Sequence, residues 1–164
     1  MTEEVQQWNS PTLGAYLLWK FTVGYCEAHK HGDAPVAILH FLALPLLTSE
    51  RLLHPISNRR ADLQSYARSF ENAKDTDVLV TVHDRVIRHR TNTIDSLDIA
   101  ISKGLMSWDT ESGKVYPSTG KVKARRGYAL RAPVNRIGKK AEILGSWFAA
   151  HEPATIAAYL KVVL

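Results

Sequence analysis

Cysteine is almost missing from this sequence, as are the short motifs that mark many enzymes. The 164 residues contain one cysteine, Cys26, so an internal disulfide is excluded, and no Cys/His pairs have the spacing of a structural zinc site. The chain also has no GxxxxGK[ST] phosphate-binding loop and no GxSxG nucleophile elbow. We therefore expect an intracellular protein of a reducing compartment that does not use either of these two catalytic designs.

The sequence lacks a hydrophobic run long enough to cross a bilayer, which takes about 20 apolar residues. The run 13–26 is interrupted by Lys20 and Thr22, and the run 35–47 contains His40 and Pro45. The first ten residues, MTEEVQQWNS, are polar and acidic, whereas a secretory signal starts with basic residues followed by an apolar stretch. We expect a cytoplasmic protein that makes no membrane contact.

Few polar side chains remain as candidates for chemistry. Cys26 lies in an apolar segment, where burial blunts a thiol, so core packing explains it better. His29, His31 and Asp33 are close enough in sequence to share a metal ion, but this pattern is more typical of an exposed helix end. Four acids that suggest a nuclease site fall on different helix faces: Glu71, Asp75, Asp77 and Asp84. We expect a non-enzyme with no catalytic residue, no metal site and no cofactor.

Acidic residues are scarce in the C-terminal part of the chain. Residues 121–164 carry nine basic and two acidic side chains, against five and five in 1–60 and seven and nine in 61–120. The run from Lys121 to Lys140 holds no acid. Such a run suits a phosphate backbone or an acidic protein face, and it is also typical of a solvated loop. If nucleic acid binds, we expect non-specific backbone contacts from Lys121, Lys123, Arg125, Arg126, Arg88 and Arg90.

Hydrophobic periodicity predicts a mainly helical domain with a winged-helix-like element built on one short β-hairpin. Helices are expected over 11–30, 34–53 with a kink or break at Pro45, 59–74, 78–90 and 94–103, and again after Asn135 and Glu152. The order of helix, short connection, helix and hairpin is that of a winged helix-turn-helix. The length favours a single compact domain, made of apolar N-terminal helices (1–60), a winged-helix-like part (61–120), and a basic loop with C-terminal helices (121–164).

The predicted recognition helix and wing are acidic where a DNA reader is basic. The helix exposes Asp95 and Asp98 and ends in the single Lys103, and the wing tip sets Asp109 and Glu111 against one lysine. Base edges are read mainly by Arg, Lys, Asn and Gln. Sequence-specific DNA recognition is therefore disfavoured.

The two N-terminal helices are apolar on nearly every side, which is unusual for a domain of this size. Either another chain covers part of their surface or the later helices wrap both of them. The sequence leaves these two explanations open.

Four stretches, in this order and spacing, resemble the middle-component family of bacterial three-component ABC systems: WNSPTLGAYLLWKFTVGY, PVAILHFLALPLL, GLMSWDTESGKVYP and KAEILGSWFAAHEPATIAAYLKVVL. The resemblance covers nearly the whole chain. It implies a small adaptor of a Lamassu-type antiphage defence complex, acting beside an SMC/Rad50-like ABC ATPase and an effector subunit that is often a nuclease. The family offers no catalytic residue to carry over.

By the same resemblance, the adaptor docks on the ATPase head, helps to hold the effector inactive until foreign DNA is sensed, and meets double-stranded DNA through the complex. Trp19, Tyr25, Leu44 and Leu47 are then the candidate interface, because their helices are too apolar for a free monomer. The alternative is a freestanding winged-helix DNA-binding regulator. A neighbouring gene for a long coiled-coil ATPase would favour the adaptor, and a palindromic site upstream of an isolated gene would favour the regulator.

Overall fold

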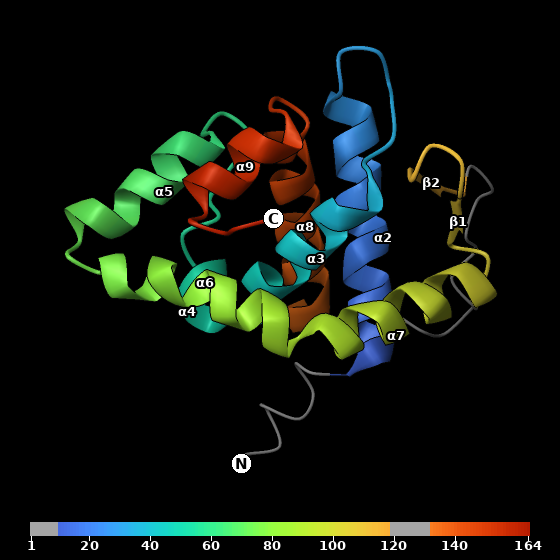
Figure 1. Ribbon diagram of the computed structural model, residues 1–164, viewed down its shortest axis with the longest axis horizontal. Coiled ribbons are helices and arrows are strands. Elements are labelled where there is room, and N and C mark those ends of the chain that lie inside the picture. The colour runs from blue at the N-terminus through green and yellow to red at the C-terminus, as the bar shows by residue number, and fades with distance from the viewer. Residues whose placement is uncertain (1–9, 119–131) are drawn as a thin grey trace.

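A computed structural model describes residues 10–118 and 132–164 of the chain. Within these residues the fold is mainly helical with one antiparallel β-hairpin, as the sequence predicts (Figure 1). In chain order the elements are α2 (Pro11–Ala28), α3 (Ala37–Leu47), α4 (Glu50–Leu53), α5 (Leu63–Asn72), α6 (Thr76–Arg88), α7 (Arg90–Ser102), β1 (Met106–Trp108), β2 (Val115–Pro117), α8 (Ala132–Phe148) and α9 (Pro153–Tyr159).

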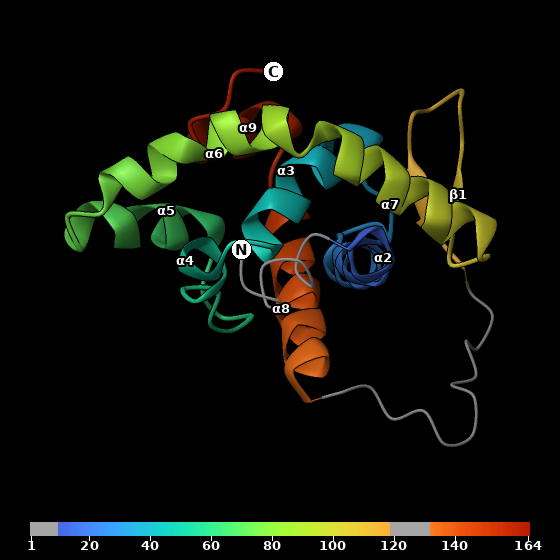
Figure 2. The same cartoon turned by 90° about the horizontal axis from the view of Figure 1, so that it is seen from below.

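Helix α2 occupies the centre of the molecule, with α8 and α7 as its main neighbours (Figures 1 and 2). It starts at Pro11, where the missing proline N–H costs nothing, and Ser10 is the N-cap residue, although its side chain makes no capping hydrogen bond. Leu17, Leu18 and Phe21 are fully buried. The helix is apolar all round because other helices of the same chain enclose it.

The contact between α2 and α8 is close because glycines face the partner helix. A Cβ at Gly24 would lie 2.6 Å from the Cα of Glu142, and one at Gly145 would lie 2.8 Å from the backbone nitrogen of Tyr25. The Lys20 Nζ also donates to Glu142 Oε1 at 2.9 Å across the same contact. The absence of a side chain at Gly24 and Gly145 therefore allows the two helices to approach closely.

Helix α3 is shorter than the sequence predicts. It starts at Ala37 instead of residue 34 because the preceding residues pair with the hairpin: Val36 forms an isolated antiparallel bridge with Lys114. The helix continues through Pro45 and ends at Leu47, after which Ser49 starts the single turn of α4. The expected break therefore lies beyond the proline, not at it.

Helices α6 and α7 form one bent rod that runs along a side of the molecule (Figure 2). Only His89 separates them, and the backbone N–H of Thr93 still donates to its carbonyl at 2.9 Å. The break expected between residues 90 and 94 lies at His89 instead. Residues 91–93 belong to α7, where Thr93 Oγ1 and Ser96 Oγ bond back to the carbonyls of His89 and Asn92 and cap no new helix. The elements follow the winged-helix order, but α6 and α7 lie nearly end to end.

The predicted hairpin is confirmed. Strands β1 and β2 pair with Met106 opposite Pro117 and Trp108 opposite Val115. Gly104 ends α7 with φ of 75°, and Gly113 in the connecting loop has φ of 72°. Both values lie in the left-handed region that glycine adopts without a side-chain clash.

The C-terminal helices differ in detail from the prediction. Helix α8 starts by Ala132, so Asn135 lies inside it and is not its cap, with Pro133 accommodated in the first turn. Helix α9 starts at Pro153 after Glu152, as expected. The helical spacing of the last segment predicts that Val163 faces inward. In the structure Val163 lies beyond the end of α9 and is 79% exposed.

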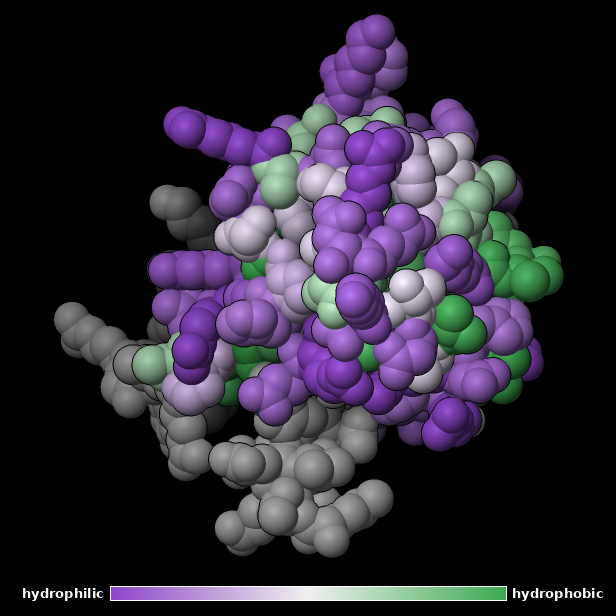
Figure 3. Space-filling view, turned by 90° about the vertical axis from the view of Figure 1, so that its left-hand side faces the viewer, coloured by the Kyte–Doolittle hydropathy of each residue, from purple (hydrophilic) through white to green (hydrophobic). Residues whose placement is uncertain are grey.

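One hydrophobic cluster joins buried residues from all of these elements. Among the described residues, no helix combines the length and the apolarity that crossing a membrane requires. The face in Figure 3 is mostly hydrophilic, but apolar side chains gather at its right-hand margin, which is the side that faces the viewer in Figure 1 and carries α6.

Candidate functional site

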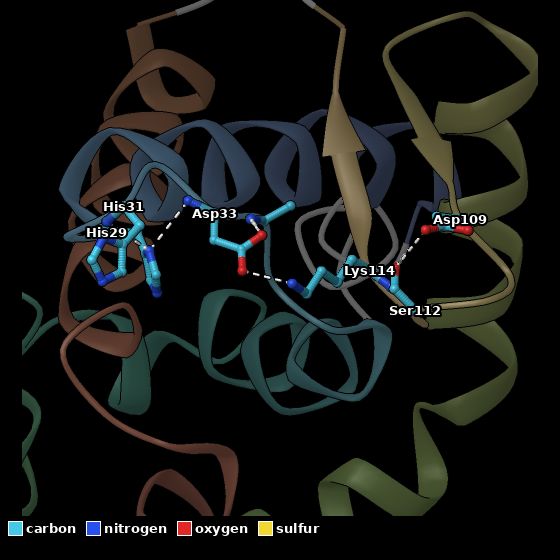
Figure 4. Close-up of polar contacts among 7 residues, drawn as sticks. His29, His31, Asp33, Asp109, Ser112 and Lys114 are labelled. Carbon is cyan, nitrogen blue, oxygen red and sulfur yellow. Dashed lines mark hydrogen bonds and ion pairs between the residues drawn. The ribbon is translucent and has the colours of Figure 1, made fainter.

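The hairpin is fastened to the segment that precedes α3 (Figure 4). Lys114 Nζ lies 2.6 Å from Asp33 Oδ2, and two backbone bonds flank this ion pair: Val115 N–H donates to the Pro35 carbonyl, and Ala37 N–H donates to the Gly113 carbonyl. The other carboxylate oxygen of Asp33 accepts from the Ala34 N–H at 2.8 Å. The hairpin is therefore held against the chain's own core.

The titration of these groups follows from the same contacts. The hydrogen bond from Lys114, with that from the Ala34 backbone, lowers the pKa of Asp33, and the bond to Asp33 raises the pKa of Lys114. In the hairpin loop, Ser112 Oγ donates to Asp109 Oδ2 at 2.7 Å and lowers the pKa of that carboxyl. These carboxylates are stabilised in their charged form, which suits a structural pair better than a general base near neutral pH.

His29 and His31 lie beside Asp33, but their geometry is that of a turn (Figure 4). The Nδ1 of His29 accepts from the backbone N–H groups of His31 and Asp33, each at 3.2 Å, and its ring stacks on Tyr25. Across residues 10–118 and 132–164, no three His, Cys, Asp or Glu side chains are placed to hold one metal ion. His29 closes the end of α2 in this arrangement.

A hollow of about 380 Å³ opens between this turn and the α8–α9 connection. Its walls are formed by polar and apolar side chains in similar measure, among them His29, Lys114, His151 and Glu152. No polar side chain aimed into it is both deeply buried and without a partner in the described part of the chain. The hollow therefore offers no specific ligand chemistry.

His40 is an ionisable group of the interior whose pKa is strongly shifted. It is fully buried, and burial lowers its pKa to about 4. Its Nε2 lies 2.9 Å from Thr22 Oγ1 and its Nδ1 lies 3.2 Å from the Ala37 carbonyl oxygen. A neutral ring makes both contacts when Nδ1–H donates to the carbonyl and Nε2 accepts the one proton of the Thr22 hydroxyl, for which the Leu18 carbonyl at 2.7 Å competes. His40 is thus a hydrogen-bonded core residue, as the sequence indicates.

The structure describes only some of the residues that are predicted to contact nucleic acid. Lys121, Lys123, Arg125 and Arg126 lie outside the described residues. Arg88 and Arg90 are exposed on either side of His89. The rod around them also exposes aspartates, namely Asp77, Asp84, Asp95 and Asp98. These two arginines do not form a positive patch with their neighbours on α6 and α7.

The residues predicted to bind a partner lie mostly inside the chain. Leu44 and Leu47 are 0% exposed and Tyr25 is 8% exposed, because α2 and α3 are wrapped by the chain's own helices. Trp19 is half-buried, and the described residues provide no hydrogen-bond partner for its Nε1. In this conformation Leu44, Leu47 and Tyr25 do not offer a docking surface, which leaves Trp19 as the accessible member of the set.

Comparison with known proteins identifies the family. A model described as ABC-three component (ABC-3C) system Middle Component 3 matches residues 1–164. The chain belongs to this family. No curated protein and no solved structure matches it. The expectation of a middle component, formed from the four stretches quoted above, is confirmed at this level.

The Middle Component 3 chain carries an exposed apolar row that the sequence reasoning missed. Val80, Ile87 and Ile94 are 57%, 60% and 42% exposed on the outer side of the α6–α7 rod, and Ile101 continues the row half-buried. We call these four residues the outer stripe. In the sequence these four residues are recognisable by their spacing of seven. The spacing of four between Val78, Val82 and Val86, which face the core, is easier to notice in the same segment.

Proposed function

We propose that this middle component is a non-catalytic adaptor of an antiphage defence complex of the Lamassu type. In this role it docks on an SMC/Rad50-like ABC ATPase and links that subunit to an effector, which is a nuclease. The observation that carries the proposal is the family match over residues 1–164. A middle component acts with the other components of its ABC system.

The chemistry of the described residues is consistent with an adaptor. Side chains whose pKa values are shifted have structural partners: Asp33 pairs with Lys114, Asp62 closes the capping box of α5 with Ser65, and His40 and Tyr66 are hydrogen-bonded in the core. None of these carboxylates or rings is aimed at a shared reaction centre.

Co-purification tests the adaptor role directly. An affinity-tagged chain is co-expressed with the ABC ATPase and the effector of its own system, and the eluted complex is analysed by native mass spectrometry. We expect all three components to elute together, and the effector to be lost from the ATPase when the chain is omitted. An ATPase–effector complex that forms equally well without this chain would contradict the proposal.

The adaptor is also proposed to contribute non-sequence-specific DNA contacts through its basic run. Reversal of Lys121, Lys123, Arg125 and Arg126 to glutamate removes four cations and is expected to weaken DNA binding by the assembled complex at least about tenfold at low salt. Because fewer counterions are released, the dependence of the binding constant on salt also becomes shallower. Fluorescence anisotropy with a random-sequence duplex measures both quantities.

A variant with half of that change in net charge serves as a control. Arg60→Glu with Arg68→Glu alters two exposed cations away from the basic run, and we expect a much smaller effect on DNA affinity. Unchanged affinity in the four-residue variant at low salt would assign the basic run to an acidic protein face. A freestanding regulator is less well supported, because α7 exposes Asp95 and Asp98 where a recognition helix carries base-reading side chains.

A further inference from the structure

The α6–α7 rod behaves as one helix in presenting its side chains. At the joint, His89 has φ of −89° and ψ of 5°, its N–H donates to the Arg85 carbonyl at 2.9 Å, and its own carbonyl accepts from Thr93. Both bonds end on His89, the one residue between the helices, which forms a turn. Val80, Ile87 and Ile94, seven apart across this joint, are all exposed and therefore lie on the solvent side of the rod.

The spacing of the outer stripe indicates what shape of partner fits it. From Val80 to Ile101 the four apolar side chains recur every seven residues, over about 30 Å at a rise of 1.5 Å per residue. A full coiled-coil seam has two apolar positions in every seven residues. The rod supplies one, with His83 and Arg90 at the next position along, so a second helix would pack along a single apolar row flanked by polar side chains. A strand or a loop has no matching period.

The charge beside the outer stripe indicates the chemistry of the partner. We call Asp77, Asp84, Asp95 and Asp98 the acidic edge; all four are exposed. Within the described ranges none of them takes part in an ion pair. The exposed cations on α6 and α7 are Arg88 and Arg90, and Arg85 is half-buried. A helix with Lys or Arg beside its apolar seam complements this edge.

The apolar surface continues beside α6. The backbone N–H of Val163 donates to His83 Nδ1 at 3.3 Å, and this contact places Val163, which is 79% exposed, next to the rod. Figure 3 shows the apolar side chains gathered along the margin of the molecule on which α6 lies. One further exposed apolar side chain, Val163, thus lies near the α6 end of the stripe.

We infer that the outer stripe and the acidic edge bind an amphipathic helix of a partner protein, one with an apolar seam of seven-residue period and a basic edge. A second copy of this chain fits less well, since its own acidic edge would meet the same charge. The inference rests on the proposed function, because it names the chemistry of a partner that an adaptor requires. It places the docking surface on α6 and α7 instead of on α2 and α3.

A designed peptide tests the inference with the full chain. The probe is a four-heptad helix with leucine at its seam positions and lysine at both flanking positions, so that its own copies repel each other. The control peptide carries glutamate at the flanking positions. We expect isothermal titration calorimetry to show micromolar binding of the lysine peptide and at least about tenfold weaker binding of the glutamate peptide.

Substitutions in the chain show where the peptide binds. Ile87→Gln with Ile94→Gln removes the centre of the outer stripe and is expected to weaken binding of the lysine peptide at least about tenfold. Ile38→Gln is the matched control, because Ile38 on α3 is 43% exposed, much as Ile94 is, but lies outside the stripe. Asp84→Lys with Asp95→Lys should reverse the preference between the two peptides.

Three results would overturn the inference: no binding of the lysine peptide to the wild-type chain, equal binding by the stripe variant, or a wild-type dimer in sedimentation velocity that the stripe variant dissociates. The last result would make a second copy the occupant. Failure of the inference is separable from failure of the adaptor role. If the stripe variant still co-purifies with the ATPase and the effector, only the docking surface is wrong.

Discussion

The N-terminal helix pair and the α6–α7 rod are opposites in how they use apolar residues. Helices α2 and α3 are apolar on nearly all sides, yet Leu44 and Leu47 are fully enclosed by the chain itself. The rod is amphipathic by composition, yet it leaves Val80 and Ile87 more than half exposed. The most apolar segments of the sequence are therefore not the segments with the most accessible apolar surface.

This contrast distinguishes two patterns that have a similar amino-acid composition: a helix that is apolar on all sides, and an apolar row on the solvent side of an amphipathic helix. A helix that is apolar all round indicates burial on several sides, and the later helices of the same chain are sufficient to supply it, as α7 and α8 do for α2. An apolar row on the solvent side of an otherwise amphipathic helix has no such explanation, because the core-facing row is already present. The second signal marks a candidate interface better than the first.

The largest expected effect compares truncations in the two regions. Leu44→Ala removes a fully buried side chain from α3 and should lower the free energy of unfolding by about 2–5 kcal/mol. Ile94→Ala removes a side chain that is 42% exposed on α7 and should cost less than about 1 kcal/mol. Urea denaturation of both variants measures the difference. Equal costs would mean that the rod's outer face is as well packed as the core.

Local chemistry in the sequence predicts the ends of several elements. Pro11 starts α2, Gly104 ends α7, and Glu152 with Pro153 starts α9, because each of these residues acts on its own backbone. The hairpin is predictable for the same reason, since two β-prone segments flank a turn-rich loop. These features need no knowledge of distant parts of the chain.

The remaining errors come from contacts between distant residues and from competing local bonds. The start of α3 is displaced because Val36 pairs with Lys114, which is remote in sequence. Residues 91–93 are expected to cap a new helix, but the side chains of Thr93 and Ser96 bond to carbonyls within the rod instead. The expected interface at Leu44 and Leu47 rests on apolarity alone, which does not say whether the covering surface belongs to this chain or to another.

The next effect concerns pH and the enclosed region. The pKa of His40 is about 4 in the folded chain against its ordinary value of 6.5. Between these values the unfolded chain binds a proton that the folded chain does not, so the free energy of unfolding falls as the pH falls from about 6.5 to 4 and is unaffected by His40 above that range. The loss attributable to this ring is at most about 3 kcal/mol.

Urea midpoints measured between pH 7 and pH 4.5 isolate this contribution. His40→Gln keeps an amide that bonds to Thr22 but does not titrate, so its midpoint should fall less steeply than that of the wild-type chain. His54→Gln is the matched control, because His54 is exposed and its replacement should leave the slope unchanged. Parallel slopes for all three proteins would mean that His40 is not enclosed as described.

The smallest effect tests how closely the enclosed region is packed. Gly24→Ala places a Cβ 2.6 Å from the Cα of Glu142, and backbone on the facing helix cannot move aside cheaply. Overpacking of this kind costs about 1–3 kcal/mol, which the better helix propensity of alanine offsets by about 1 kcal/mol.

Gly138→Ala, also on the α2–α8 contact, is the control. Its Cβ would meet only the Tyr16 side chain, 2.9 Å from Cε1. Because a side chain yields more cheaply than backbone, although the Tyr16 hydroxyl is buried, thermal denaturation should show Gly24→Ala more destabilised than Gly138→Ala. The opposite order would mean that the backbone contact at Gly24 yields more easily than the Tyr16 side chain does at Gly138.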